Sequence, residues 1–194
     1  MKNNFSVERI GHDDYRPWVL EKHYAHREPP VSFAFGLFEN HILIGICTFG
    51  VPSSSPLRRG ICGYQYEGIV FELNRLVIET DTKNAASFFV SRCLLMMPRP
   101  SIIISYADTE HNHIGYVYQA CNFIYTGLSA KRTDWKISGL EHLHGQTVAD
   151  ISRGECDRVG YMRRTYGDSF YLEERSRKHR YVYFLGSKRE TKQM

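Results

Sequence analysis

One strand, one tight turn and one helix follow each other between residues 69 and 97, and they constrain the fold more than any other feature. Residues 69–79 (IVFELNRLVIE) have the pattern of a central β-strand, and residues 84–97 (NAASFFVSRCLLMM) have that of an apolar helix closed by Pro98. Free backbone N–H groups and the helix dipole converge at such a turn. The turn contains no glycine, and it is a candidate site for an anion or a cofactor.

Helical and strand-like segments alternate through the first two thirds of the chain. Helical spacing is found at residues 13–27, 84–97 and 113–123, and strand-like runs at 32–39, 42–51, 69–79, 101–108 and 123–129. Asn40 and His41 separate the first two strands, which is typical of a hairpin. This order predicts an α/β (α+β) fold with a mixed sheet flanked by helices.

The pattern changes beyond Ser129, where polar, irregular sequence surrounds two short helical segments before a final strand, RYVYFLG. No repeat or low-complexity linker interrupts the 194 residues. We therefore expect one domain over residues 1–194, with a core at about 5–130 and an appended substrate-binding region at about 131–194.

Composition narrows the cellular setting. No apolar run approaches the roughly 20 residues that span a bilayer, and the first residues lack the apolar segment of a signal peptide. The five cysteines are far apart and form no C-x-x-C pair, so reduced thiols are expected rather than disulfides or a thiolate zinc site. These features predict a soluble, cytoplasmic protein.

Positive charge is concentrated towards the end of the sequence. Residues 1–130 carry 11 Lys and Arg against 12 Asp and Glu, whereas residues 131–194 carry 14 against 9. In the second region, YMRRTYG and ERSRKHRYVYF interleave basic and aromatic residues, which suits phosphates and stacked or flipped bases. The alternative is a soluble edge strand protected by charge.

Arg75 and Asp108 are candidate functional residues because of their places in strands. A buried guanidinium needs a carboxylate, phosphate or carbonyl partner, and Arg75 could instead lie on a solvated face and pair with Glu72 or Glu79. Asp108 ends an apolar strand at the edge where open α/β sheets bind ligands. It could take a proton from an amine, or it could cap the next helix.

Tyrosine, serine and histidine supply weaker candidates. Tyr116 and Tyr118 lie two apart on a helix, so one can pack while the other reaches a cleft. Ser87 lies in the first turn of its helix without a G-x-S-x-G elbow, which favours binding over nucleophilic attack. The close histidine pairs are 23/26, 111/113 and 142/144; two ligands do not make a metal site, and no metal is expected.

Several stretches together resemble the phage Mom proteins, DNA-modification enzymes related to the GNAT-type N-acetyltransferase fold. They are KHYAHR, ELNRLVIE with KNAASFFV, SYADTEHNHIGYVYQACNFIYTG and KHRYVYFLG, between about Lys22 and Gly186. The resemblance implies a GNAT-like, mainly antiparallel sheet. It also implies conversion of adenine in double-stranded DNA to N(6)-carbamoylmethyladenine, which blocks host restriction enzymes.

The resemblance also assigns roles to individual residues. It implies catalytic roles for Arg75, Ser87, Asp108 and Tyr118. Substrate binding is expected of His23, Tyr24, Asn84, Ala85 and Tyr116. DNA binding is expected of the basic residues Lys131, Arg132, Arg163, Arg164, Arg177, Lys178 and Arg180.

The glycine-free turn departs from ordinary acetyltransferases, which carry Q/R-x-x-G-x-G/A there to grip coenzyme A. Side chains of Thr82–Ser87 stand in its place, which argues against coenzyme A in its usual pose. The product needs a methylene on the adenine nitrogen, and a glycyl donor could supply it. An activated acyl donor is therefore expected, either glycyl-tRNA or acetyl-coenzyme A.

Two other functions remain open at this point. One is a coenzyme A-dependent acyltransferase acting on a protein or small amine, and the other is a non-catalytic DNA-binding, anti-restriction protein. The expected partners are double-stranded DNA and, with a glycyl-tRNA donor, charged tRNA, in the host cytoplasm and without a membrane. The oligomeric state is open.

Overall fold

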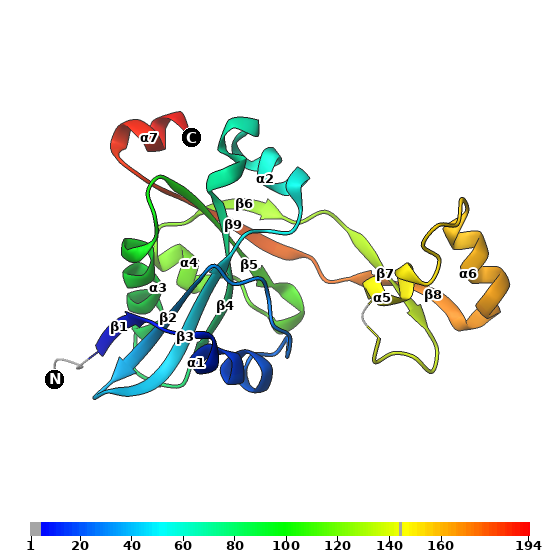
Figure 1. Ribbon diagram of the computed structural model, residues 1–194, viewed down its shortest axis with the longest axis horizontal. Coiled ribbons are helices and arrows are strands. Elements are labelled where there is room, and N and C mark those ends of the chain that lie inside the picture. The colour runs from blue at the N-terminus through cyan, green and yellow to red at the C-terminus, as the bar shows by residue number, and fades with distance from the viewer. Residues whose placement is uncertain (1–4, 144) are drawn as a thin grey trace. The chain divides into compact units, whose positions relative to one another are not determined.

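A computed structural model describes residues 5–143 and 145–194 (Figure 1). The chain divides into two compact units, each described separately below. The first contains the residues up to Ala107, His113–Gly127 and His179–Met194. The second contains Asp108–Asn112 and Leu128–Lys178.

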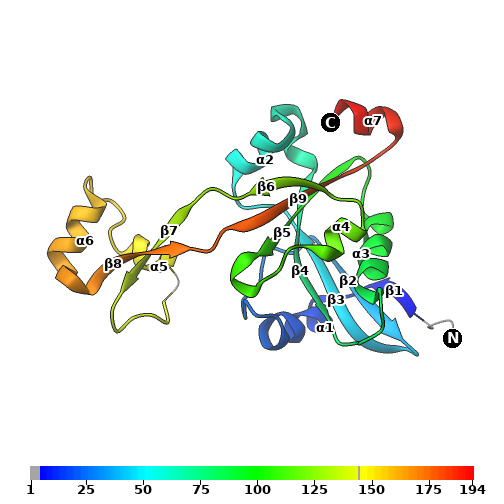
Figure 2. The ribbon, with the colours of Figure 1, turned by 180° about the vertical axis from the view of Figure 1, so that it is seen from behind.

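A seven-stranded sheet in the order β1-β2-β3-β4-β5-β9-β6 forms the first unit (Figures 1 and 2). β1 to β4 are antiparallel neighbours, and β4 and β5 are parallel. The strands are β1 (Phe5–Arg9), β2 (Phe33–Glu39), β3 (Ile42–Gly50), β4 (Val70–Ile78), β5 (Ser101–Asp108), β6 (Ile124–Leu128) and β9 (Lys178–Leu185). The mixed, mainly antiparallel sheet flanked by helices confirms the predicted fold class.

Helices pack on both faces of this sheet because successive side chains of a strand point to opposite faces, and the strands carry apolar side chains on both. One face is covered by α3 (Ala85–Met96), whose buried residues join Phe35, Cys47 and Leu73 in the main core, and by α4 (Tyr116–Ala120), which packs partly buried side chains against that core. The other face carries two smaller cores. They involve α1 (His12–Pro17) with η1 (Trp18–Lys22), and α2 (Ser55–Cys62) with η2 (Tyr64–Ile69), near the C-terminal α7 (Lys188–Gln193).

The second unit is a two-stranded antiparallel sheet with short helices and a core of its own. β7 (Arg132–Ile137) pairs with β8 (Phe170–Arg175). The remaining elements are η3 (Thr109–His111), α5 (Gly145–Asp150), α6 (Arg158–Tyr166) and η4 (Gly167–Ser169). Ile137, Val148, Met162 and Phe170 form the buried cluster.

Local sequence signals explain where several elements begin and end. Asn40 and His41 both have positive φ, 50° and 67°, as a two-residue hairpin turn requires. The first helical segment ends earlier than residue 27, because His23 is extended and follows the π-helical turn η1. Tyr24 therefore lies in a loop, 43% exposed, rather than on the apolar face with Tyr15 and Trp18.

The appended region also has a different boundary from the expected one. β9 lies between β5 and β6 in the main sheet, so residues 179–194 belong to the first unit. The physical reason is that Tyr181, Val182 and Leu185 are buried in the cores of that sheet. Whether the chain behaves as one domain stays a prediction.

Candidate functional site

The most distinctive backbone feature is where β4 and β5 stop pairing. The parallel ladder joins only Val70–Leu73 to Ile102–Ser105, although β4 continues to Ile78. The register with β3 shifts beside Asn74, so that residue is the extra one of a β-bulge. The Ser105 hydroxyl, fully buried, donates to the Leu73 carbonyl at 3.0 Å. Two polar residues, Asn74 and Arg75, follow directly.

Arg75 is held by carbonyl groups and not by a carboxylate. Its Nη1 donates to the Asn74 carbonyl at 2.7 Å and its Nη2 to the Arg27 carbonyl at 2.8 Å. Its Nε is buried and has no partner among the described residues. Burial lowers the pKa of Arg75, Tyr24 and Glu72 oppose the shift, and the charge of Arg27 adds to it. Arg75 stays cationic and can hold a carbonyl or an anion.

The expected alternative partner of Arg75, Glu79, is engaged elsewhere. Glu79 forms an ion pair with Lys22 at 2.6 Å. Glu72 lies close enough to Arg75 to act on its pKa. The carbonyl-bound geometry therefore differs from a surface ion pair with Glu79.

Asn74 ties the loop before β2 to the bulge. Its side-chain oxygen accepts from the buried Thr48 hydroxyl at 2.6 Å, and its Nδ2 donates to the Pro30 carbonyl at 2.8 Å. Gly50 approaches Pro30 so closely that a Cβ there would lie 1.8 Å from the Pro30 oxygen. These contacts fix the segment that carries His23, Tyr24 and Arg27.

The predicted residues His23 and Tyr24 come together as an aromatic pair. His23 is buried, and its Nδ1 accepts from the Ala25 N–H at 3.0 Å. The rings of His23 and Tyr24 stack at 4.3 Å, and His113 meets Tyr24 edge-on at 6.0 Å. Tyr24 therefore has two ring contacts and remains 43% exposed.

Tyr118 is the tyrosine that reaches this region, from α4. It packs against Phe123 and Tyr181, with ring centroids 5.5 and 5.4 Å away. Burial raises the pKa of Tyr118, the Ser105 hydroxyl acts in the opposite direction, and Cys47, Tyr24 and Glu72 add to the rise. The phenol therefore stays protonated and can donate a proton. We call His23, Tyr24, Arg75 and Tyr118 the Arg75 cluster.

Tyr116 does not share these surroundings. It is the first residue of α4, and it is 73% exposed. Residues two apart on a helix point in different directions, which accounts for the contrast with Tyr118. Its predicted substrate-binding role stays a prediction.

The glycine-free turn places Asn84 and Ser87 at the start of α3. Asn84 has a left-handed conformation (φ 64°) and gives no side-chain cap, and Ala85 is buried. The Ser87 hydroxyl donates to the Asn84 carbonyl at 3.1 Å. The backbone carbonyl of Ser87 accepts from the Cys121 thiol at 3.4 Å. The Ser87 hydroxyl is thus used locally, but its oxygen can still accept a hydrogen bond.

Asp108 lies in a fully connected polar cluster of the second unit. Its Oδ2 pairs with Lys178 at 2.8 Å, and its Oδ1 accepts from Ser176 at 2.8 Å and from the Glu110 N–H at 3.1 Å. Burial alone would raise the pKa of Asp108, but these partners hold it below its usual value. We call Asp108, Ser176 and Lys178 the Asp108 cluster. Asp108 also caps η3, as one of the two alternatives predicted.

The predicted DNA-binding residues fall into two kinds. Three make internal contacts: Lys178 with Asp108, Arg177 with the Ser129 carbonyl at 2.7 Å, and Arg180 with the Thr126 hydroxyl at 2.8 Å. The other four are exposed, and among the described residues their one ion-pair partner is Asp157, 3.7 Å from Arg164. They are Lys131, Arg132, Arg163 and Arg164.

The described residues meet neither the requirements of a metal site nor those of a membrane-spanning helix. Within residues 5–143 and 145–194, no group of three or more His, Cys, Asp and Glu side chains could hold a metal. His144 lies outside the described residues. None of the helices in the described part of the chain is long and apolar enough to cross a membrane.

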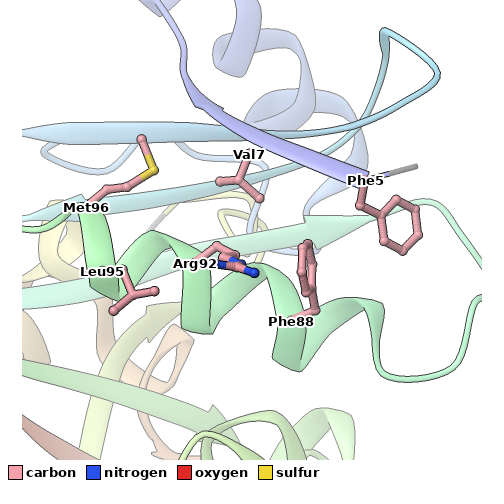
Figure 3. A pocket seen from close by; sticks show the side chains of 6 residues that line it. All are labelled: Phe5, Val7, Phe88, Arg92, Leu95 and Met96. Atoms are coloured by element: carbon pink, nitrogen blue, oxygen red, sulfur yellow. The ribbon is translucent and has the colours of Figure 1, made fainter. Parts of the chain in front are cut away.

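A surface pocket lies apart from the predicted site residues, between β1 and α3 (Figure 3). Its lining is largely apolar, and Arg92 lies over the Phe88 ring at 5.3 Å. The lining residues are Phe5, Val7, Phe88, Arg92, Leu95 and Met96.

Sequence reasoning missed several residues that support the Arg75 cluster. They are Arg27, Thr48, Asn74 and Ser105, together with Ser176 in the Asp108 cluster. Only Ser105 had a visible signal, a hydroxyl inside an otherwise apolar strand. The roles of the others depend on contacts between segments that are distant in sequence, and no local sequence pattern predicts such contacts.

Comparison with known proteins places the chain in a family. The model of the Mom protein family matches residues 4–194. The chain is also 30% identical over 182 residues to "Methylcarbamoylase mom" of Escherichia phage Mu, covering 89% of this chain and 72% of that protein. The chain belongs to the Mom protein family.

Solved structures similar to this family member are acetyltransferases. The ribosomal-protein-S5-alanine acetyltransferase from Vibrio fischeri matches with a TM-score of 0.52 and 9% identity, covering 96% of each chain. A GNAT family acetyltransferase from Elizabethkingia anophelis with acetyl-CoA bound matches at 0.51 and 9% identity, covering 95% of this chain and 100% of that one. At such low identity the likeness shows the fold alone, which is GNAT-like.

Proposed function

We propose that this protein is a transferase that modifies adenine in double-stranded DNA to N(6)-carbamoylmethyladenine and so protects the DNA from host restriction. Family membership over nearly the whole chain supports the reaction class, since the relative from phage Mu is named a methylcarbamoylase. The structural observation that carries the proposal is the Arg75 cluster. The Arg75 guanidinium donates to two carbonyls and lies near the exposed Tyr24 ring, and both Tyr24 and Glu72 act on Arg75 and on the protonated Tyr118 phenol.

Each residue of the Arg75 cluster has a role in this proposal. Tyr118 donates a proton to the leaving oxygen, because its raised pKa keeps the phenol protonated at neutral pH. Arg75, with Ser87 at the start of α3, holds the donor carbonyl or its ribose. Tyr24 stacks on the adenine, which must leave the duplex because its amine is otherwise paired.

The Asp108 cluster has a separate proposed role. Asp108 accepts a hydrogen bond from the adenine amine and assists its deprotonation. Its depressed pKa keeps the carboxylate ionised at neutral pH, which favours the acceptor role. The exposed basic residues of the second unit supply phosphate contacts in this proposal, with Lys131, Arg132, Arg163 and Arg164 better placed than the internally bonded ones.

The donor in the proposal is a glycyl ester such as that of glycyl-tRNA. The adenine amine attacks the glycyl carbonyl, the ester C–O bond breaks, and the ribose hydroxyl leaves with a proton. The free glycyl amine then attacks ring carbon 6 through a five-membered intermediate, and the original nitrogen leaves the ring as the carboxamide. Atoms balance without an oxidant, and the two nitrogens exchange places.

Isotope labelling tests this donor chemistry. Glycine labelled at nitrogen is supplied to cells that express the protein, and the modified nucleoside is fragmented in a mass spectrometer. The label is expected on the ring-attached nitrogen. Label found only in the carboxamide would contradict the rearrangement.

The proposed reaction itself is tested by nucleoside mass spectrometry of DNA from expressing cells. The wild-type protein is expected to produce a modified adenine that the Asp108→Ala variant does not. An unchanged adenine profile with the wild-type protein would contradict the proposed function.

A coenzyme A-dependent N-acyltransferase is the second candidate, favoured by the GNAT-like fold. The Elizabethkingia anophelis structure contains acetyl-CoA, and so does that of a putative acetyltransferase from Salmonella typhimurium with a TM-score of 0.51. Tight acetyl-coenzyme A binding combined with unmodified DNA would favour this candidate.

A further inference from the structure

Arg27 combines a fixed backbone with an exposed side chain. Its carbonyl accepts from Arg75 at 2.8 Å, and the same loop is held through the Pro30 carbonyl by Asn74. The Arg27 side chain is exposed and forms no hydrogen bond or ion pair within the described part of the chain. The backbone contact thus places a cation on the loop, while leaving its guanidinium available to a ligand.

The carboxylates near this loop leave the Arg27 charge without an ion-pair partner among the described residues. Arg27 and Arg75 are near enough for one charge to lower the pKa of the other, and Glu72 is the carboxylate that acts on Arg75 from nearby. Glu28, next in sequence, is already engaged by His12 at 2.9 Å and by Arg16 at 3.6 Å. The Arg27 guanidinium thus adds its charge to that of Arg75, whose Nη2 donates to the Arg27 carbonyl, and a local excess of positive charge attracts an anion.

An exposed aromatic ring lies on the same loop. Tyr24 precedes Arg27 by three residues, is 43% exposed, and is supported by His23 and His113. A supported aromatic ring beside cations matches a nucleotide, whose base stacks while its phosphate pairs with arginine. A free inorganic anion would need no ring, and a peptide carboxylate would need no stacking surface.

We propose that Arg27 binds a phosphate of the DNA strand that carries the target adenine, beside the base stacked on Tyr24. This assignment rests on the proposed function and names a contact outside the basic C-terminal region. Arg27 is a binding residue in this proposal and does not take part in the chemistry. The Arg27→Ala variant isolates the role, because it removes the guanidinium and keeps the carbonyl that holds Arg75.

The test measures how DNA binding depends on salt. Each phosphate contact contributes about 0.9 to the slope of log K against log salt for duplex DNA. Wild type, Arg27→Ala, Arg27→Lys and the matched control Arg92→Ala are titrated with a duplex of mixed sequence. Arg92 is an exposed arginine over the Phe88 ring on α3.

The expected result is a slope lower by about 1 in Arg27→Ala and affinity roughly tenfold weaker at low salt. Arg27→Lys should keep the slope, because it keeps the charge, and Arg92→Ala should match the wild type. An Arg27→Ala slope equal to that of Arg92→Ala would overturn the assignment.

A second measurement separates this assignment from the proposed function. Where the wild type modifies a mapped adenine, 2-aminopurine is placed at that position, and its fluorescence rise on binding reports base flipping. Arg27→Ala is expected to lower that rise, and a rise equal to wild type would count against a contact beside the flipped base. If wild type modifies no DNA, the proposed function fails, but the salt slopes still decide whether Arg27 contacts phosphate.

Discussion

The Arg75 cluster in the first unit and the Asp108 cluster in the second differ in how their polar groups are satisfied. Asp108 has a cation, a hydroxyl and an N–H, all within 3.1 Å. Arg75 has two carbonyls and one buried Nε without a partner in the described residues. The charge of the Asp108 carboxylate is already compensated by its partners. The charge of Arg75 is not compensated by its carbonyl partners, so Arg75 can still attract an anionic or polar ligand.

The two clusters also shift pKa values in different ways. Burial dominates in the Arg75 cluster, where it lowers the pKa of Arg75 and raises that of Tyr118. In the Asp108 cluster the hydrogen bonds outweigh burial and lower the pKa of Asp108. The comparison suggests that substitutions in the first cluster affect ligand chemistry, while those in the second also affect stability and its pH dependence.

The largest expected effect is that of Tyr118→Phe. Loss of the phenolic proton should reduce adenine modification by about 100-fold. Thermal stability should change little, because the ring that packs on Phe123 and Tyr181 remains. Modified nucleosides are quantified against Tyr183→Phe, which keeps its ring in the same core. Equal activity of the two variants would remove Tyr118 from the chemistry.

Asn74→Ala should come next, because it breaks the link between the bulge and the loop. The Thr48 hydroxyl, fully buried, would lose its acceptor, and the free energy of unfolding should fall by about 1–3 kcal/mol. Modification should fall as well, since the loop carries Tyr24 and Arg27. Urea unfolding of Asn74→Ala, Thr48→Val and the double variant tests the coupling. Additive losses would show that the two side chains act independently.

Lys178→Met should alter the pH dependence of stability. The depressed pKa of Asp108 contributes stability that is present above the unfolded value, about pH 4, and is lost as pH falls through the lower folded value. Removing the ammonium moves the folded pKa upward. The stability gained between pH 3 and pH 7 should therefore shrink by about 1 kcal/mol.

Urea unfolding at several pH values measures this effect. Lys136→Met is the matched control, because Lys136 pairs with the exposed Glu173 at 3.5 Å in the same unit. Lys178→Arg should retain the wild-type profile. A Lys178→Met profile that parallels wild type would show that Ser176 and the Glu110 N–H alone hold Asp108 ionised.

The smallest effect is expected for Arg163→Ala, which should weaken DNA binding a few-fold without loss of stability. Arg163 is exposed on α6, and its side chain forms no hydrogen bond or ion pair within the described residues. Arg180→Ala should instead lower stability, because Arg180 bonds the Thr126 hydroxyl. Binding titrations and thermal melts on both variants test the distinction. The reverse pattern would contradict the division between exposed and internally bonded cations.

Much of the fold could be predicted from local patterns. The hairpin at Asn40 and His41, the strand containing Arg75 and the helix after the glycine-free turn all appear where periodicity and turn residues place them. The place of β9 could not, because strand order depends on which buried faces match across the sheet. The helix predicted over residues 13–27 also ends early, since η1 ends it at Lys22.

Less of the candidate site could be predicted. Motifs pointed to His23, Arg75, Asp108 and Tyr118, but not to the atoms that hold them. Lys178 was expected to bind DNA, and its ammonium is bonded to Asp108. That pairing joins residues 70 positions apart in sequence, so only folding could reveal it.

The sequence by itself determined the family, the order of helices and strands, and the residue types that carry chemistry. Those follow from local spacing, which acts over a few residues. Only the tertiary structure decided that Arg75 is held by carbonyls, that Asn74 anchors the loop bearing Arg27, and that Asp108 is already paired. Burial and hydrogen bonding between distant segments set the charge and availability of each group, and both arise only when the chain has folded.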